Sequence, residues 1–387
     1  MNKTYLIYLL AFGGFVMATS EIVMAGILGM VAQDLDVSVG AAGQLVTVFA
    51  AVFGIGSPIL VTLTSRMERK KLLILTFIVF IIGNLIAFFS PNFAVLVVSR
   101  VVLAASASVY TVVALTSGSS MAAPGRQGNA IGIIIMGFST ALVVGAPLGT
   151  LIGEYWGWRS IFLLIPILAI PAVIGIAALV PKMSGQAPIP LGEQLRILRN
   201  PRIVGGLSIT FFWIVGYQLM FTYISPFLQQ AAGLNTARIS AVLLACGLFA
   251  VAGSRLGGYG ADKWGTYRTL IGSLLIHAVA LVLLPWTATS LTGALIMVAV
   301  WVGAAWMTTP VQQFYLVSLS PDASGLALGL NNSILQIGMA VGAGAGGWIV
   351  NRLSVLNLGW MGSLSIGIGL LAVFYSVRSS RTMNPSR

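Results

Sequence analysis

Long apolar segments separated by short polar turns are the feature that most constrains what this chain can become. Twelve such segments follow one another along the sequence, and a helix needs about 20 apolar residues to cross a bilayer. Only 7% of the 387 residues are charged and 58% are hydrophobic, whereas an ordinary soluble domain has about 25% charged residues. A soluble protein of this length has too little interior for so many apolar side chains. The sequence therefore predicts an all-α integral membrane protein and excludes a soluble globular protein, a disordered chain and a nucleic-acid module.

The apolar runs and the polar residues between them set the boundaries of the twelve predicted transmembrane helices. These helices are expected over residues 5–30, 40–64, 71–90, 93–117, 128–152, 160–180, 203–228, 237–260, 268–286, 291–317, 324–350 and 357–377. The first run follows Lys3 but is longer than the apolar core of a signal peptide, so we interpret it as a retained helix.

The distribution of Lys and Arg predicts the orientation of these helices. If the N-terminus lies inside, fifteen of the 20 basic residues fall on inner segments, and only Arg159, Arg238 and Arg352 fall on outer ones. Cytoplasmic segments of membrane proteins carry such an excess of Lys and Arg. We therefore expect both termini in the cytoplasm and the chain in the cell (inner) membrane, where its net charge of +12 faces anionic lipid and not nucleic acid.

The second half of the chain repeats the first at an offset of 197 residues, at which Gly145, for example, aligns with Gly342. The repeat predicts two six-helix bundles of the same direction, over residues 1–180 and 203–387, joined by a cytoplasmic linker over 181–202. The linker pattern suits a short amphipathic helix on the inner membrane surface, and a plain connection is an equal alternative. Parallel repeats of this kind are typical of transporters that alternate access to a site near the membrane midplane.

A basic turn joins the second and third helices of each predicted bundle. In the second bundle it reads GSRLGGYGADKWGTYR over residues 253–268, where Asp262 can cap a helix and Lys263 lies at the inner interface. This stretch resembles the loop signature of the major facilitator superfamily, G-x-L-x-D-R-x-G-R. The turn of the first bundle keeps Arg66 but has Ser65 in place of the family's Asp. The resemblance implies gating and packing roles for Arg66, Asp262 and Lys263.

The fifth predicted helix contains glycines four residues apart. Gly145 and Gly149 line one face and admit a neighbouring helix closely, while Pro147 can bend the helix between them. The stretch GFSTALVVGAPLGTLIG resembles the G-x-x-x-G-P-x-x-G signature of drug:proton antiporters, with departures at Ala146 and Thr150. The resemblance implies that this face takes part in the rocking of the two bundles, and ordinary helix packing explains the pattern equally well.

Two charged residues lie inside predicted helices. Glu21 and Arg100 sit at similar depths, about 14 Å and 12 Å from the outer helix ends at the α-helical rise, so they can pair within the first bundle. Charges at such depths are costly and usually functional. We predict that Glu21 binds the coupling proton, and that Arg100 either takes part in coupling or only holds the carboxylate. The aligned position of the second bundle carries Gln218 in place of the acid.

Aromatic and amide side chains gather mainly in the predicted helices of the second bundle. Aromatic rings can stack on a flat ligand, and amides are costly in hydrocarbon unless they face a cavity. The predicted substrate-binding residues are Tyr110, Trp213, Tyr217, Gln218, Trp306, Gln312, Asn331, Asn332 and Gln336. His277, the only histidine, is expected to be a hydrogen-bonded residue of a peripheral helix.

The resemblance to the drug:proton antiporter group extends over nearly the whole chain. Stretches such as AQDLDVSVGAAGQL (32–45), SPNFAVLVVSRV (90–101) and TPVQQFYLVSLSPDASG (309–325) look most similar to bacterial purine-base, nucleoside and sugar efflux pumps. The resemblance implies export of a small molecule in exchange for protons. It further implies a monomer that needs no cofactor beyond the proton gradient.

Other functions stay open at this point. The substrate can be a sugar or another drug-like molecule, and the chain can be a facilitator or an importer, because no motif encodes direction. A channel would not need a buried acid for coupling. A membrane-embedded enzyme would need a catalytic constellation, and the sequence has neither an H-E-x-x-H motif nor paired intramembrane aspartates. We therefore expect a transporter without a metal site, and not an enzyme.

Overall fold

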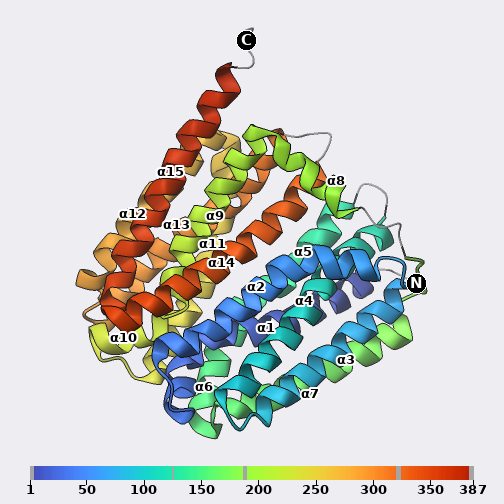
Figure 1. The fold of residues 1–387 in the computed structure, drawn as a ribbon, viewed down its shortest axis with the longest axis horizontal. Helices are drawn as coiled ribbons and strands as arrows, with labels where there is room; N and C mark the ends of the chain where they lie inside the picture. The colour runs from blue at the N-terminus through green and yellow to red at the C-terminus, as the bar shows by residue number, and fades with distance from the viewer. Residues whose placement is uncertain (1–3, 124–125, 186–189, 320–323, 383–387) are drawn as a thin grey trace.

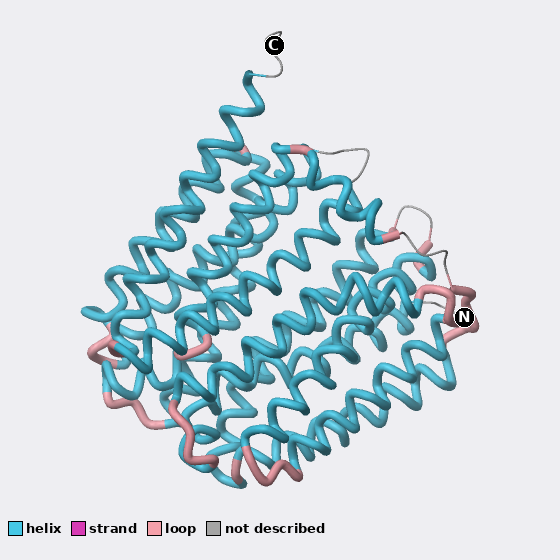
Figure 2. Tube along the Cα trace, in the orientation of Figure 1, coloured by secondary structure: helices cyan, strands magenta, loops and turns pink. Residues whose placement is uncertain are grey.

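The computed structural model describes residues 4–123, 126–185, 190–319 and 324–382. Over these ranges the regular structure is helical, and Figure 2 shows helices joined by short loops with no strand. Twelve helical spans are long and apolar enough to cross a membrane, which confirms the number predicted from the apolar runs.

The first six spans contain helices α1 to α7. Their bounds are α1 (Thr4–Asp34), α2 (Val39–Thr64), α3 (Arg69–Phe88), α4 (Phe93–Met121), α5 (Gln127–Thr140), η1 (Ala141–Gly145), α6 (Ala146–Trp156) and α7 (Trp158–Leu179).

The linker and the second six spans contain the remaining helices. Their bounds are α8 (Leu191–Arg196), η2 (Ile197–Arg199), α9 (Pro201–Phe221), α10 (Ile224–Ala232), α11 (Thr236–Trp264), α12 (Thr266–Thr287), α13 (Leu291–Leu319), α14 (Ser324–Arg352), η4 (Val355–Asn357) and α15 (Leu358–Thr382). A short helix is thus present in the linker, of which residues 186–189 lie outside the described chain.

Polar side chains determine where several helices begin. The side-chain oxygens of Ser38, Asn92 and Asn235 accept hydrogen bonds from backbone N–H groups of the first turns of α2, α4 and α11. These groups have no partner within the helix, so a side-chain acceptor stabilises the helix start. The sharp turn between α11 and α12 is made by Gly265, whose φ of 87° is accessible to glycine at little cost.

The fifth span consists of three consecutive elements because it contains a proline. Proline has no N–H to donate, and its ring crowds the carbonyl one turn earlier, so a regular α-helix cannot continue unchanged. Immediately before Pro147, the π-helical turn η1 widens the backbone, and the N–H of Ala146 bonds to the carbonyl of Ala141, five residues earlier. The proline therefore coincides with a widened turn.

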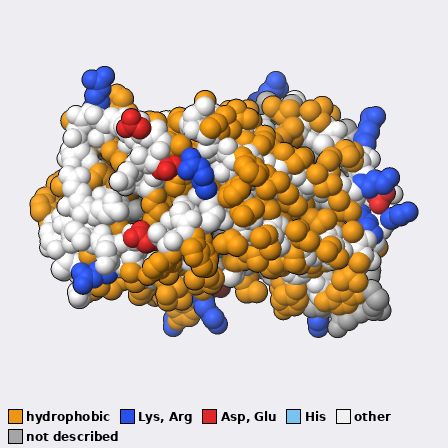
Figure 3. Space-filling view, turned by 90° about the horizontal axis from the view of Figure 1, so that it is seen from below, with side chains coloured by type: hydrophobic (Ala, Val, Ile, Leu, Met, Phe, Trp, Pro, Cys, Tyr) orange, Lys and Arg blue, Asp and Glu red, His pale blue; other side chains and the backbone are white. Residues whose placement is uncertain are grey.

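The spans form two bundles that lie side by side, α1 to α7 in one half and α9 to α15 in the other (Figure 1). Figure 1 places the two ends of the chain and α8 on the same side of the molecule, which we call the termini end; we call the opposite side the far end. Hydrophobic side chains cover much of the surface in Figure 3, and Lys and Arg gather towards its edges. This distribution suits a protein whose middle is surrounded by lipid.

The two halves touch closely at the far end. Gly40 of α2 lies so near α14 that an added Cβ would be 2.4 Å from the carbonyl oxygen of Gly347. An added Cβ at Gly43 would be 1.9 Å from the Tyr223 hydroxyl, which itself donates to the carbonyl of Ala343 at 2.8 Å. Small residues thus allow the two backbones to meet here.

Hydrogen bonds reinforce the far-end contact. Three hydroxyls of the second half donate to the first half at 2.8 Å, from Ser225 to the carbonyl of Ala25, from Ser240 to the carbonyl of Pro147, and from Thr236 to the carboxylate of Glu154. In the described parts of the spans, no such bond joins the halves at the termini end. Figure 1 shows α2 and α14 adjacent at the far end and diverging towards the termini end. The molecule is therefore closed at the far end.

Candidate functional site

The acidic side chain inside the membrane-spanning core belongs to Glu21, midway along α1. It lies about 20 Å from Asp34, the last residue of the helix, at the α-helical rise. The other acidic residues that the structure describes lie at or near the ends of helices or in turns. Glu21 retains partial exposure despite this depth, so a water molecule can reach it.

Glu21 faces the other half of the molecule. Its carboxylate is close enough to the side-chain amide of Gln336 on α14 for a polar interaction. Gln336 itself is held at the crossing of α2 and α14, where its Cβ lies 3.1 Å from the position that a Cβ on Gly54 would take. The site therefore joins a carboxylate of the first half to an amide of the second.

Arg100 of α4 lies on another side of the same segment of α1. Its guanidinium is fully buried, and it donates to the carbonyl of Ser20 at 3.0 Å and to the Met24 sulfur at 3.1 Å. It also lies over the ring of Phe162 on α7, at 4.9 Å from the centroid. These contacts fasten α1 to two helices of its own half.

The expected pairing of Glu21 and Arg100 takes an indirect form. No nitrogen of Arg100 lies within 4.0 Å of the Glu21 carboxylate in the described chain, because the guanidinium is held by neighbours of Glu21 on α1. The positive charge is nevertheless near enough to act on the carboxylate through space. The hydrogen bonds of Arg100 and its contact with Phe162 all lie in the first half, so its position relative to Glu21 is expected to stay the same when the two halves move.

Three of the predicted aromatic residues lie close to one another in the second half. The indole N–H of Trp306 on α13 donates to the Tyr217 hydroxyl on α9 at 3.3 Å. The Tyr217 ring stacks on Phe221, with centroids 5.2 Å apart, and lies 5.3 Å from the ring of Trp301. Trp213, one turn before Tyr217, has an indole N–H without a hydrogen-bond partner among the described residues. These rings therefore form a buried aromatic cluster of α9 and α13, in which Trp306 is only partly buried.

His277 adds an unexpected member to this aromatic cluster. Its ring is fully buried and lies edge-on to Tyr217 at 6.3 Å. Neither ring nitrogen has a hydrogen-bond partner among the described residues, so the expectation of a hydrogen-bonded histidine is wrong. A single sequence position gives no indication that α12 turns a polar ring towards α9.

Several of the predicted amide residues are occupied by contacts within the second half. The amide nitrogen of Gln312 donates to the Thr210 hydroxyl at 3.1 Å, and this hydroxyl donates to the Asn331 side-chain oxygen at 2.7 Å. Gln218 donates to Thr222 of the following turn at 3.0 Å. Gln312 and Asn331 therefore join α13 and α14 to Thr210 of α9, whereas the bond of Gln218 stays within the end of α9. Asn332 is half-buried and has no such partner among the described residues, so it stays available to a ligand.

Tyr110 lies apart from these groups. Its side chain is fully buried, its hydroxyl donates to the carbonyl of Leu10 at 2.7 Å, and its ring meets Phe77 edge-on at 5.1 Å. The polar group is thus already used within the first bundle. We no longer include Tyr110 among the candidate ligand-binding residues.

The glycine face of the fifth span packs within the first half and not between the halves. An added Cβ at Gly145 would lie 2.6 Å from the Thr19 hydroxyl of α1, and one at Gly149 would lie 2.3 Å from Val23 of the same helix. The second half meets the opposite side of this span, where a Cβ on Gly247 of α11 would be 2.4 Å from the Cα of Val143. The sequence pattern identified a close contact but not the helix that makes it.

This placement predicts the effect of a substitution at Gly145. Gly145→Leu should overpack the contact with α1 and destabilise the first half by about 1–3 kcal/mol. Thermal unfolding of the purified protein measures the effect as a lower melting temperature. Gly132→Leu on the same span is the control, because nothing lies within 4 Å of an added Cβ there. Equal stability of the two variants would contradict the assignment.

The residues of the two basic turns occupy the termini end. Arg66 is exposed and borders a cavity of about 350 Å³ with Lys182, while Ser65 uses its hydroxyl to donate to the carbonyl of Thr62 at 2.8 Å. Asp262 lies inside the last turn of α11 and is exposed, and α12 has no side-chain cap, so the expected capping role of Asp262 is wrong. Lys263 lies 5.3 Å above the ring of Tyr259. Among the described residues, Arg66, Asp262 and Lys263 make no hydrogen bond or ion pair to the other half.

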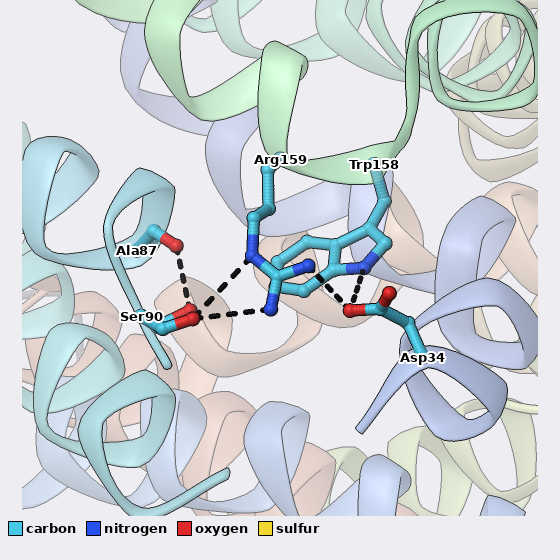
Figure 4. A network of polar contacts seen from close by, with 5 residues as sticks. All are labelled: Asp34, Ala87, Ser90, Trp158 and Arg159. Carbon is cyan, nitrogen blue, oxygen red and sulfur yellow. Dashed lines mark hydrogen bonds and ion pairs between the residues drawn. The ribbon is translucent and has the colours of Figure 1, made fainter. Parts of the chain in front are cut away.

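A polar network at the far end was not anticipated from the sequence. Figure 4 shows the guanidinium of Arg159 between Ser90 and Asp34, with the indole N–H of Trp158 donating to the same carboxylate at 3.2 Å. Arg159 also donates to the carbonyl of Ser90 at 3.1 Å. The network ties the end of α1 to the α3–α4 turn and to the start of α7. Trp158 and Arg159 are neighbours in the sequence, but only the fold brings them to Asp34.

Comparison with known proteins identifies the family. The model of the Major Facilitator Superfamily matches residues 10–343. The uncharacterized MFS-type transporter YbcL of Bacillus subtilis (strain 168) is 40% identical over 372 residues, covering 96% of this chain and 95% of that protein. The inner membrane transport protein YdhP of Escherichia coli (strain K12) is 29% identical over 98% of this chain and 97% of its own.

The fold agrees with that of a solved structure. The crystal structure of a D-xylose-proton symporter superposes with a TM-score of 0.78 over 96% of each chain, at 17% sequence identity. The relatives are transporters, and this chain is accordingly a transporter and not an enzyme. Its twelve spans, its two bundles and its sequence together make it a member of the Major Facilitator Superfamily.

Proposed function

We propose that the chain exports a small organic molecule from the cytoplasm in exchange for protons. The observation that carries the proposal is the position of Glu21, a lone carboxylate at the boundary between the halves. A buried charge of this kind is costly, and in transporters it marks a proton or ion pathway. Drug:proton antiporters, purine-base and nucleoside efflux pumps are the resemblances that point to export.

The proton is proposed to act through the contact between Glu21 and Gln336. A charged carboxylate accepts a stronger hydrogen bond than a neutral carboxyl group. The Gln336 amide therefore favours the ionised form of Glu21 when the far end is closed. When α14 moves away, this hydrogen bond is lost and the protonated form of Glu21 becomes more populated. Arg100 is bonded to the Ser20 carbonyl beside Glu21 on α1, so it is expected to move with Glu21. Opening and closing of the far end thus bind and release the proton.

The substrate is proposed to be a flat, nitrogen-containing molecule such as a purine base or nucleoside. The partly buried ring of Trp306 offers a stacking surface, and the half-buried Asn332 offers an amide. Stacking contributes about 0.5–1.5 kcal/mol beyond the area buried, and the amide can both donate and accept. This combination supports a planar heteroaromatic ligand.

A sugar is the second candidate, because aromatic rings and amides are also suited to hydroxyl-rich rings. A thermal-shift screen of the purified protein against purines, nucleosides, sugars and lipophilic cations separates these classes. Under the first proposal a purine or nucleoside raises the melting temperature, and Asn332→Leu removes the shift. Stabilisation by a sugar alone would favour the second.

Transport itself is tested with the ligand that the screen selects. Proteoliposomes with an imposed pH gradient should accumulate the ligand against its concentration gradient, and dissipation of the pH gradient should stop this accumulation. Equilibration without accumulation would indicate a facilitator. Accumulation in the same direction as the proton flux would indicate an importer.

The distribution of basic residues supports placing the termini end in the cytoplasm of a cell-membrane protein. Cysteine labelling in intact cells checks this orientation in a Cys246→Ala background. A cysteine in place of exposed Tyr155, at the far end, should react with an impermeant maleimide from outside. A cysteine in place of Lys182, at the termini end, should react only after permeabilisation. The opposite pattern would reverse the proposed orientation.

A further inference from the structure

A groove between α9 and α15 opens on the outer surface of the second half, away from the contact between the halves. It has a volume of about 530 Å³ and is lined mainly by apolar side chains, among them Val204, Phe212, Ile368 and Leu371. Both helices cross the membrane, so the groove lies where lipid surrounds the protein.

The groove begins at the membrane surface and runs inwards. Arg199, at the end of the linker, lines its mouth, and Phe212 lies deepest on α9. Pro201 and Phe212 lie eleven residues apart on α9, a distance of about 16 Å along the helix axis at the α-helical rise. A chain of that length reaches from the headgroup region well into the hydrocarbon of one leaflet.

The mouth of the groove carries positive charge. Arg199, which lines the mouth, is exposed. Basic groups between transmembrane helices recognise anionic headgroups, and each contributes a favourable interaction near the surface.

Small side chains make room for the occupant. Gly205 and Ser208 line the α9 wall, and Ser208 turns its hydroxyl to the carbonyl of Val204 at 2.8 Å, which leaves an apolar surface towards the groove. Tyr375 of α15 is exposed beside the mouth, where its ring can lie at the interface between headgroup and hydrocarbon.

We propose that this groove binds one anionic phospholipid of the leaflet at the termini end. One acyl chain lies between α9 and α15, and the phosphate is bound by Arg199. A peptide or a partner helix fits less well, because the mouth carries the positive charge of Arg199 and the helical walls have no free backbone groups. The lipid would join the linker to the second half without entering the path between the halves.

Native mass spectrometry of the purified full chain tests the proposal with defined lipids. After exchange into detergent containing equal amounts of phosphatidylglycerol and phosphatidylcholine, the wild type should retain phosphatidylglycerol preferentially. Arg199→Gln should reduce this preference about fivefold, the loss expected for one basic residue at a membrane surface. Arg196→Gln is the matched control, since Arg196 is exposed on the same linker but does not line the groove.

A second variant tests the groove independently of its charge. Ser208→Phe should fill the groove and reduce retention of phosphatidylglycerol while Arg199 is intact; its thermal melting in lipid-free detergent should match that of the wild type. If Arg199→Gln and Arg196→Gln lose the preference for phosphatidylglycerol equally, the preference reflects general surface charge, which would contradict binding at the groove. No preference for phosphatidylglycerol in the wild type, or full retention in Ser208→Phe, would overturn the proposal.

Discussion

Glu21→Gln is expected to reduce uphill, proton-driven transport to the level of empty vesicles while exchange of substrate across the membrane continues. Glutamine keeps the size and hydrogen-bonding capacity of the side chain but cannot bind or release a proton. The contact with Gln336 remains possible, so the site stays folded. What is lost is the change of charge that distinguishes the two states.

Transport by Glu21→Gln is measured in proteoliposomes, with and without an imposed pH gradient, next to counterflow of labelled substrate. Asp36→Asn is the control, because it removes a carboxylate that is exposed beyond the end of α1. Asparagine also tolerates the Asp36 backbone φ of 50°. The control should transport like the wild type. Uphill transport at the wild-type rate by Glu21→Gln would remove the carboxylate from the mechanism.

Gly43→Leu is expected to prevent closure of the far end and to stop the transport cycle. The added side chain would occupy the space of the Tyr223 ring, whose hydroxyl lies 1.9 Å from an ideal Cβ at this position. Tyr223 is fully buried and bonded to Ala343, so it cannot move aside without breaking the contact with α14. Overpacking of this kind costs about 1–3 kcal/mol, which shifts a two-state population by about five- to 150-fold.

Gly56→Leu on the same helix is the matched control for Gly43→Leu. Its nearest neighbours are the side chains of Leu60 and Val52 at 3.6 Å and 3.9 Å, so a leucine fits there. Gly43→Leu should expose residues at the far end to labelling and lower the transport rate, and Gly56→Leu should do neither. Normal transport by Gly43→Leu would mean that the far-end crossing of α2 and α14 is not needed for the cycle.

The helical spans could be predicted because the membrane imposes a simple rule on the sequence. Each crossing needs a long apolar run, and the runs can be counted without knowing which helix packs on which. The division of the fifth span into α5, η1 and α6 was less accessible, since Pro147 indicates an irregularity but not whether the helix bends, breaks or widens. The local hydrogen bond of Ala146 to Ala141 decides the form it takes.

Contacts between helices could not be predicted to the same degree. Gly145 and Gly149 share one face of a helix in any α-helical conformation, but the sequence does not say which neighbour that face meets, and it meets α1. The far-end glycines Gly40 and Gly43 carried a similar signal, which stood out less because no proline accompanied it. Small residues indicate that a helix face allows close approach, whereas the arrangement of all twelve spans determines which helix that face contacts.

The polar groups of the site show the same limit. The depth of Glu21 followed from counting residues along a helix, and so did the level of Arg100. The indirect relation between them depends on which carbonyl the guanidinium reaches, and it reaches Ser20. Similarly, Gln312 and Asn331 were recognised as polar residues in an apolar helix, but only the packing of α9, α13 and α14 shows that they bind Thr210.

The link between Glu21 and the opening of the far end is tested most directly by distances between the halves as a function of pH. Spin labels at Tyr155 and Arg238 report on the far end, and labels at Gln127 and Trp264 report on the termini end, in a Cys246→Ala background. Glu154→Gln serves as a control, because Glu154 is a second carboxylate at the contact between the halves and accepts a hydrogen bond from Thr236 across the far end.

Lowering the pH should lengthen the far-end distance and shorten the termini-end distance in the wild type and in Glu154→Gln, since protonation weakens the contact of Glu21 with Gln336. In Glu21→Gln both distances should be independent of pH. Wild-type distances that do not change with pH would contradict the proposed role of Glu21. Distances in Glu21→Gln that change with pH as in the wild type would contradict it as well.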